Sequence, residues 1–230
     1  MTDTATIHLV PHADVAERVL LPGDPGRALR LAQLLLTPPK MLNHNRGLWG
    51  YTGAGPDGEP LTIQSTGMGG PSAAIVVEEL IRLGARRLVR VGTCGAIADG
   101  VALGEIVVGS GVLAEDGTSR ALGHGGTLRP DPELHAALLG AANGAREGLV
   151  VSSDLFYDPD PGRYDRWAAA GALVVEMEFA TLVAVAERRG VAAACVLVVS
   201  DEIAAGSRIG SEALEDGERE LGRIAAAALA

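Results

Sequence analysis

The strongest constraint on this chain is a regular alternation of short β-rich runs with segments whose apolar residues recur at helical spacing. The β-rich runs lie at residues 18–23, 61–67, 86–93, 104–110, 147–153 and 192–201. The helical patterns lie at residues 25–36, 71–84, 131–146, 178–189 and 211–229. This alternation predicts an α/β fold with a largely parallel or mixed sheet covered by helices on both faces. A Gly-rich polar segment at 114–130 predicts a surface loop.

The length of 230 residues and a hydrophobic content of 47% fit one domain, which we place over residues 1–230. The apolar stretches are shorter than the roughly 20 residues of a membrane span, and no signal peptide is visible, so we expect a cytoplasmic protein without membrane contact. A formal net charge of −10 argues against nucleic-acid binding. Cys94 and Cys195 lie outside any metal-binding spacing, so we expect neither a disulfide framework nor a metal site.

Ligands of α/β proteins gather where strands end and lead into helices, so the residues that follow each strand are candidates for a site. The first such place is "LPGDPGRA", in which Gly23 and Gly26 free the backbone and Arg27 falls in the first helical turn. This arrangement suits an anion. An ordinary strand-to-helix turn, with Asp24 as the helix cap, explains the same residues equally well.

Two further arginines stand near strand ends. Arg90 lies between valines inside a β-rich run, where a charged side chain needs an anionic partner, either a bound anion or a core Asp or Glu. Thr93 then offers a hydroxyl group where that strand ends. Arg46 occupies the turn "NRG", and taken alone it would be a solvated surface arginine.

Three carboxylates complete the candidate set. Glu176 and Glu178 flank a methionine in "VVEMEFA", a stretch that otherwise has the composition of a buried segment. Burying an ionised carboxylate is strongly unfavourable unless the group is paired, so these two side chains must hold something. Asp201 closes the last apolar strand, where it is either a helix cap or a proton donor.

In this order, the motifs resemble the nucleoside phosphorylase family, which includes hexameric bacterial purine nucleoside phosphorylases, archaeal methylthioadenosine phosphorylases and uridine phosphorylases. The matching segments are "ERVLLPGDPGRA", "NRGLWGYTG", "TGMGGPSAAIVVEELIRLGA", "RVGTCGAI", "SSDLFY", "VVEMEFATL" and "VLVVSD". The resemblance implies the nucleoside phosphorylase fold, a single-domain three-layer sandwich with a central mixed, twisted sheet.

The same resemblance implies roles for individual residues. Gly23, Arg27, Arg90 and Thr93 match phosphate-binding positions, and Arg46 matches an arginine that a neighbouring subunit contributes. Guanidinium groups suit this task because their forked donors fit phosphate oxygens.

A second group of residues resembles the nucleoside pocket of the family. Glu178 matches the residue that accepts hydrogen bonds from the ribose hydroxyls, and Asp201 matches the acid that gives or shares a proton with purine N7. His8, or His12 in its place, matches a histidine that reaches the ribose 5′ end in a neighbour's site. The other matches line the sugar and base: Met68, Cys94, Gly95, Phe156, Val175, Glu176, Met177 and Ser200.

The implied activity is phosphorolysis of purine nucleosides, with inorganic phosphate as co-substrate and no metal or organic cofactor. Sites shared between subunits imply a homo-oligomer, at least a dimer and by resemblance a hexamer built as a trimer of dimers. The chain departs from some relatives where an arginine thirteen residues after the acid assists it, because Leu214 stands there and Arg208 and Arg219 are out of register.

Four alternatives stay open. A methylthioadenosine phosphorylase cannot be separated from a purine nucleoside phosphorylase on these residues, whereas Asp201 favours purines over uridine. A nucleosidase, which uses water, is disfavoured by Arg27, Arg46 and Arg90. A non-catalytic nucleoside-binding protein is disfavoured by Asp201 together with the phosphate set.

Overall fold

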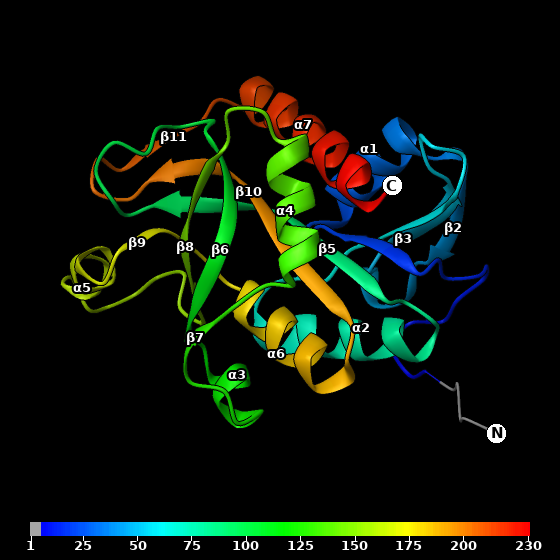
Figure 1. Cartoon of the computed structure of the whole chain (residues 1–230), viewed down its shortest axis with the longest axis horizontal. Coiled ribbons are helices and arrows are strands. Elements are labelled where there is room, and N and C mark those ends of the chain that lie inside the picture. Colours follow the sequence, from blue (N-terminus) through cyan, green and yellow to red (C-terminus); the bar gives the residue numbers. More distant parts are fainter. Residues whose placement is uncertain (1–5) are drawn as a thin grey trace.

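The computed structural model describes residues 6–230, which form one mixed sheet with helices on both sides (Figure 1). The strands are β1 (Arg18–Leu21), β2 (Thr37–Asn43), β3 (Gly50–Ala54), β4 (Pro60–Gln64), β5 (Arg87–Ala96), β6 (Ile106–Glu115), β7 (Gly126–Leu128), β8 (Arg146–Ser153), β9 (Ala172–Glu176), β10 (Ala192–Glu202) and β11 (Ser207–Arg208). The helices are α1 (Pro25–Leu35), α2 (Gly70–Arg82), α3 (Gly117–Ala121), α4 (Pro132–Ala141), α5 (Arg163–Ala169), α6 (Phe179–Arg189) and α7 (Ser211–Leu229), with a short 3₁₀ turn η1 (Asn45–Gly47).

The sheet order is β11-β10-β6-β8-β9-β5-β1-β4-β3-β2, with β7 paired to β6. β10 pairs with β5 as well as with β6, so β10, β6, β8, β9 and β5 close a ring. Within this ring β5 changes its neighbour: it pairs with β1 as far as Arg90 and with β9 at Gly95 and Ala96. Ligands of α/β proteins bind where strand order changes in this way, so the segment between Arg90 and Gly95 is the expected location of a site.

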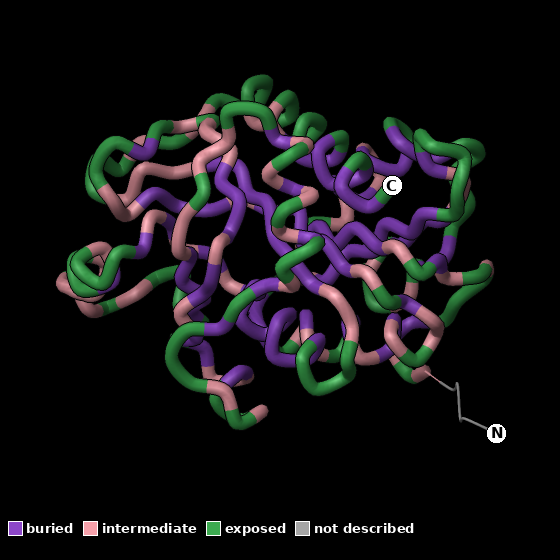
Figure 2. The backbone as a smooth tube through the Cα atoms, in the orientation of Figure 1, coloured by how far each residue is buried: buried purple, intermediate pink, exposed green. Residues whose placement is uncertain are grey.

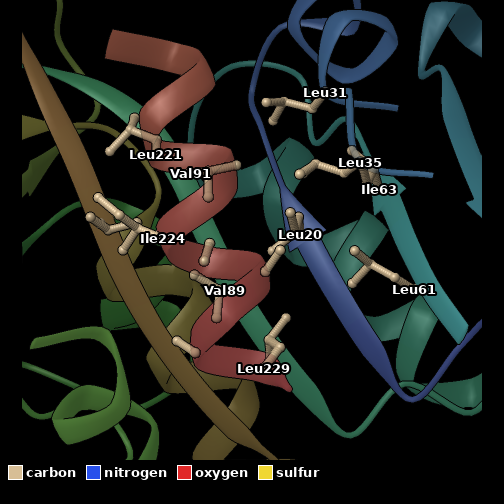
Figure 3. Close-up of a cluster of buried hydrophobic side chains, with 14 of the residues drawn as sticks. Leu20, Leu31, Leu35, Leu61, Ile63, Val89, Val91, Leu221, Ile224 and Leu229 are labelled. Carbon is tan, nitrogen blue, oxygen red and sulfur yellow. The ribbon is translucent and has the colours of Figure 1, made fainter. Parts of the chain in front are cut away.

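Alternating side chains along the strands separate two layers of helices. Leu20 belongs to a core cluster under α1, α4 and α7, whereas Val19 and Leu21 belong to a cluster with α2 and α6. Figure 3 shows the first cluster, in which Leu221 and Ile224 of α7 lie over strand β5, which carries Val89 and Val91. In Figure 2 the central strands are buried and the outer loops exposed. No helix within residues 6–230 is long and apolar enough to cross a bilayer.

The predicted fold class is confirmed, and the five helices expected from spacing are α1, α2, α4, α6 and α7. The surface loop expected at 114–130 is wrong, because this segment contains the end of β6, α3 and β7. Asp116 explains the difference: its buried carboxylate caps α3 by accepting from Ser119 N at 2.8 Å, and it also accepts from Thr181 Oγ1 at 2.9 Å. A polar run therefore docks on α6 instead of remaining free.

Candidate active site

A cavity of about 900 Å³ opens at the carboxyl ends of β1, β5, β9 and β10. This volume lies within the range of roughly 300–1,000 Å³ that is typical of small-molecule sites. All but two of the residues proposed from the sequence line it: Gly23, Arg27, Met68, Arg90, Thr93, Cys94, Gly95, Phe156, Val175, Glu176, Met177, Glu178, Ser200 and Asp201. Their individual roles stay predictions, but the fold brings segments far apart in sequence to one place.

Arg27 comes to the cavity from the first turn of α1. Asp24 caps this helix by accepting from Arg27 N at 2.6 Å, which is the structural role that the sequence left open for Asp24. The Arg27 side chain is buried, and its Nε donates to Glu218 Oε1 of α7 at 2.8 Å. Gly23, in the turn that follows β1, lies so close to Gly67 that a Cβ would stand 3.2 Å from the Gly67 carbonyl oxygen.

Arg90 is a deeply buried charged group of the cavity, with 5% of its surface exposed. Its Nε lies 2.6 Å from Glu176 Oε2, and its Nη2 lies 2.6 Å from Glu178 Oε2. The guanidinium folds back over Gly92, where a Cβ would stand 2.8 Å from Nη2. Core glutamates therefore supply the anionic partner that the sequence demanded for Arg90, and a bound anion as a further partner stays a prediction.

The two glutamates of "VVEMEFA" have different surroundings. Glu176 accepts from Ser152 Oγ and from Phe179 N at the start of α6, in addition to its ion pair with Arg90. Both of its oxygens are engaged with protein donors, so this carboxylate holds Arg90 and the first turn of α6 in place. Its predicted contact with a nucleoside stays untested.

Glu178 has fewer protein partners and lies at the cavity wall. It accepts from Gly69 N at 2.5 Å and pairs with Arg90, and Gly69 itself has a positive φ of 84°, which favours glycine at this position. Burial raises the pKa of the Glu178 carboxyl, and the charge of Arg90 opposes this rise. A carboxylate of this kind can accept further hydrogen bonds from a ligand with neighbouring hydroxyl groups.

Asp201 lies at the far end of β10. Its carboxylate pairs with Arg208 Nε from the neighbouring strand β11 and accepts from Ser200 Oγ at 2.7 Å. In the register of β10 and β5, Arg90 stands opposite Cys195 and Gly95 stands opposite Asp201. Five residues of β5 therefore separate the levels of Arg90 and Asp201, which is about 16 Å of extended strand.

The remaining wall is largely apolar. Met68 and Phe156 are 86% and 57% exposed at the mouth of the cavity, and Phe156 packs edge-on against Tyr157. Cys94 is buried, and burial raises the pKa of its thiol, so it lines the cavity as a small apolar group rather than as a nucleophile. A second cavity of about 530 Å³ shares Met68 and Met177 with the first.

The structure does not bring His8 and Arg46 into this cavity. Arg46 is exposed in η1 and has a φ of 58°. His12, the alternative to His8, stacks on His44 with the two ring centroids 5.4 Å apart. His8 Nδ1 lies 2.9 Å from Glu79 Oε1 of α2, and this carboxylate also accepts from Leu9 N at 2.7 Å. Their predicted service to a neighbouring subunit stays a prediction.

Sequence reasoning missed several residues of the cavity and its surroundings. Tyr157, Tyr164 and Arg208 line the cavity, and Glu218 and Glu79 hold residues of the predicted set. The motif "SSDLFY" was a signal for Tyr157. Among residues 6–230 no group of three or more His, Cys, Asp and Glu side chains is arranged to hold a metal ion.

The fold and this cavity define an α/β protein with a small-molecule site at the carboxyl ends of its strands. The family model described as "Phosphorylase superfamily" matches residues 17–230, and the chain belongs to this superfamily. The resemblance drawn from the motifs is thereby confirmed.

Similar proteins agree with this assignment. The chain is 39% identical to a guanosine phosphorylase of Halorubrum lacusprofundi, over 89% of this chain and 86% of the relative. It is 37% identical to a DeoD-type purine nucleoside phosphorylase of Geobacillus kaustophilus, over 86% of each chain. The crystal structure of purine nucleoside phosphorylase from Toxoplasma gondii in complex with immucillin-H has a TM-score of 0.88, with 27% identity and coverage of 98% of this chain and 97% of the other.

Proposed function

We propose that this protein is a purine nucleoside phosphorylase, a pentosyltransferase that splits the N-glycosidic bond of purine ribonucleosides and deoxyribonucleosides. A phosphate oxygen forms a bond to the sugar C1′ while the bond between C1′ and N9 breaks, and that electron pair leaves with the purine. The products are the free purine base and (deoxy)ribose 1-phosphate. Inorganic phosphate is the co-substrate, and the proposal includes no metal or organic cofactor.

The observation that carries the proposal is the order of charged groups along one cavity. Arg27 and Arg90 lie near the start of α1 and the middle of β5, Glu178 pairs with Arg90, and Asp201 lies at the level of Gly95. A phosphate beside the arginines, a ribose beside Glu178 and a purine toward Asp201 fit this order. The similar proteins named as purine nucleoside phosphorylases support the same reading.

Each group has a task in this reaction. The guanidinium groups bind the dianionic phosphate and orient it toward C1′. Glu178 accepts hydrogen bonds from the ribose hydroxyls, which fixes the sugar while C1′ gains positive charge. Asp201 gives or shares a proton with N7, where negative charge develops as the purine leaves. Phe156 and the apolar wall bury the base.

We also propose that the protein acts in purine salvage in the cytoplasm, as a homo-oligomer whose sites are shared between subunits and which by resemblance is a hexamer. Supporting observations are the exposed Arg46 in its ordered turn and His8 held by Glu79, both outside the cavity of their own chain. Exposed Met68 at the cavity mouth is a suitable contact for a neighbour.

A product assay tests the proposal. Purified protein is incubated with adenosine, inosine, guanosine, methylthioadenosine or uridine, with and without phosphate, and base and sugar phosphate are quantified by chromatography. We expect a purine base and ribose 1-phosphate in equal amounts, only when phosphate is present. Base release without phosphate would identify a nucleosidase, and preferential cleavage of uridine would identify a uridine phosphorylase. Asp201→Asn should lower the kcat for the nucleoside strongly and change the affinity for phosphate less.

A further inference from the structure

Glu218 of α7 links the C-terminal helix to the cavity. It is 4% exposed, and it is a single carboxylate between two guanidinium groups. Oε1 accepts from Arg27 Nε at 2.8 Å, and Oε2 accepts from Arg30 Nη2 at 2.5 Å. Nothing in its local sequence indicates this position, because α7 also carries exposed carboxylates on the same turns, such as Glu215 and Glu220.

The close packing of α7 on α1 produces this contact. At Gly222 a Cβ would stand 2.5 Å from Leu31 Cδ2, so the two helices approach more closely than a larger residue would allow. Glu218 lies four residues before Gly222, and Arg27 lies four residues before Leu31, which is one helical turn in each case. The same face that packs Gly222 on Leu31 therefore brings Glu218 to Arg27.

The contact leaves part of Arg27 available to a ligand. Glu218 engages Nε, and Nη1 lies 3.5 Å from the Val91 carbonyl oxygen. Within residues 6–230 Nη2 makes no hydrogen bond to a protein acceptor, so the outer donors of this guanidinium, those on Nη2, remain for the cavity that Arg27 lines. Because a guanidinium is rigid, holding Nε sets the direction of these outer donors.

We propose that Glu218 is a positioning residue for phosphate: through Arg27 Nε it orients the outer donors of this guanidinium toward the anion. This inference rests on the proposed function, since it assigns Arg27 to phosphate. Positioning and simple charge neutralisation make opposite predictions. A carboxylate beside Arg27 reduces the positive potential at the anion site, so its removal should strengthen phosphate binding if charge alone matters.

Two variants separate these possibilities. Glu218→Gln keeps the shape of the side chain and removes its charge, whereas Glu218→Asp keeps the charge and withdraws it by one methylene group. Positioning predicts that both variants raise the KM of inorganic phosphate by about tenfold or more, the loss expected for one charge-assisted hydrogen bond. The KM of the purine nucleoside should change by less than about threefold.

The matched control is Glu220→Gln, which removes a carboxylate from the exposed face of the same helix, where Glu220 lies near Arg223. It should leave both KM values at the wild-type level. Thermal unfolding of each variant without inorganic phosphate measures the stability of the fold, and the rise in unfolding temperature on adding phosphate measures ligand binding. If Glu218→Gln does not fold, the phosphate KM of Glu218→Asp tests the proposal instead.

The outcomes are distinct. A lower phosphate KM in Glu218→Gln with an unchanged value in Glu218→Asp would show charge neutralisation and overturn positioning. Unchanged phosphate KM values in both variants, with lower unfolding temperatures, would show a purely structural ion pair and also overturn it. Wild-type protein that cleaves nucleosides without any phosphate dependence would instead contradict the proposed function itself.

Discussion

Arg208 and Asp201 face each other across the antiparallel pair formed by β11 and β10, and their side chains form an ion pair at the cavity. The Asp201 carboxylate is held from a second side by Ser200 Oγ at 2.7 Å. A guanidinium on one oxygen and a hydroxyl on the other fix the direction of the carboxylate. Arg208 therefore contacts the acid although it stands seven residues after Asp201, and not at the thirteenth position, which Leu214 occupies.

Arg208→Ala should lower turnover, because Asp201 loses the partner that orients it toward the purine. Arg208 is 70% exposed on its side chain, so the expected fall in kcat is only about threefold to tenfold. The KM of phosphate should not change, since Arg27 and Arg90 lie at another level of the sheet. Steady-state kinetics with both substrates varied measure this, with Arg223→Ala on α7 as an exposed control. A changed phosphate KM would argue against the assigned place of Arg208.

Glu178→Gln should reduce kcat/KM for ribonucleosides more than for 2′-deoxyribonucleosides. The amide removes the charge that strengthens hydrogen bonds from the 2′- and 3′-hydroxyls, and a deoxyriboside has only one of these to lose. We expect losses of about 100-fold for the riboside and about tenfold for the deoxyriboside. Parallel assays of guanosine and 2′-deoxyguanosine provide the ratio. Equal losses for both substrates would exclude a contact with the 2′-hydroxyl.

Much of the site could be predicted from the sequence because the segments that follow the strands of an α/β sheet gather at one edge, where ligands bind. Arg90 among valines and the paired glutamates of "VVEMEFA" each required a partner, and the structure places them against one another. The expectation worked because burying a charge is unfavourable wherever it occurs, so charged residues in apolar runs reveal contacts without knowledge of the fold.

The contacts that were missed depend on tertiary structure. Glu218 is 191 residues from Arg27 in sequence, and only the approach of α7 to α1 at Gly222 joins them. Arg208 reaches Asp201 because β11 pairs antiparallel with β10 and sets the two residues opposite each other, which spacing in the sequence does not reveal. The segment 114–130 was judged by its glycines, whereas the buried cap Asp116 decides its structure.

Glu79→Gln should destabilise the protein at neutral pH. Burial alone would raise the pKa of the Glu79 carboxyl, but hydrogen bonds from Leu9 N and from His8 outweigh this and lower the pKa below its ordinary value of 4.5. A folded-state pKa below the unfolded-state value stabilises the protein above pH 4.5, and this contribution disappears as pH falls. The expected loss at pH 7 is about 2 kcal/mol of unfolding free energy.

Chemical denaturation of wild type and Glu79→Gln between pH 7 and pH 3 measures this effect. The difference between the two proteins should shrink as the pH falls below 4.5, because wild-type Glu79 then becomes neutral as well. Glu78→Gln is the control, since Glu78 pairs with Arg189 on the exposed side of the same helix. A difference that does not vary with pH would mean that the charge of Glu79 is not what anchors residues 7–9.

Co-production of two inactive variants tests whether Arg46 serves a neighbour. Arg46→Ala removes a group that a chain would donate, and Arg90→Ala removes a group that a chain keeps in its own cavity, so each variant alone should lose most phosphorolysis. In a mixed dimer the Arg46→Ala chain retains Arg90 and receives Arg46 from its partner, which restores one site. Random pairing should then return about one quarter of the wild-type sites. The matched control is co-production of Arg27→Ala with Arg90→Ala. Both of these groups belong to a chain's own cavity, so no pairing of the two variants restores a site. Recovered activity in this control, or no recovered activity when Arg46→Ala is combined with Arg90→Ala, would contradict a shared site.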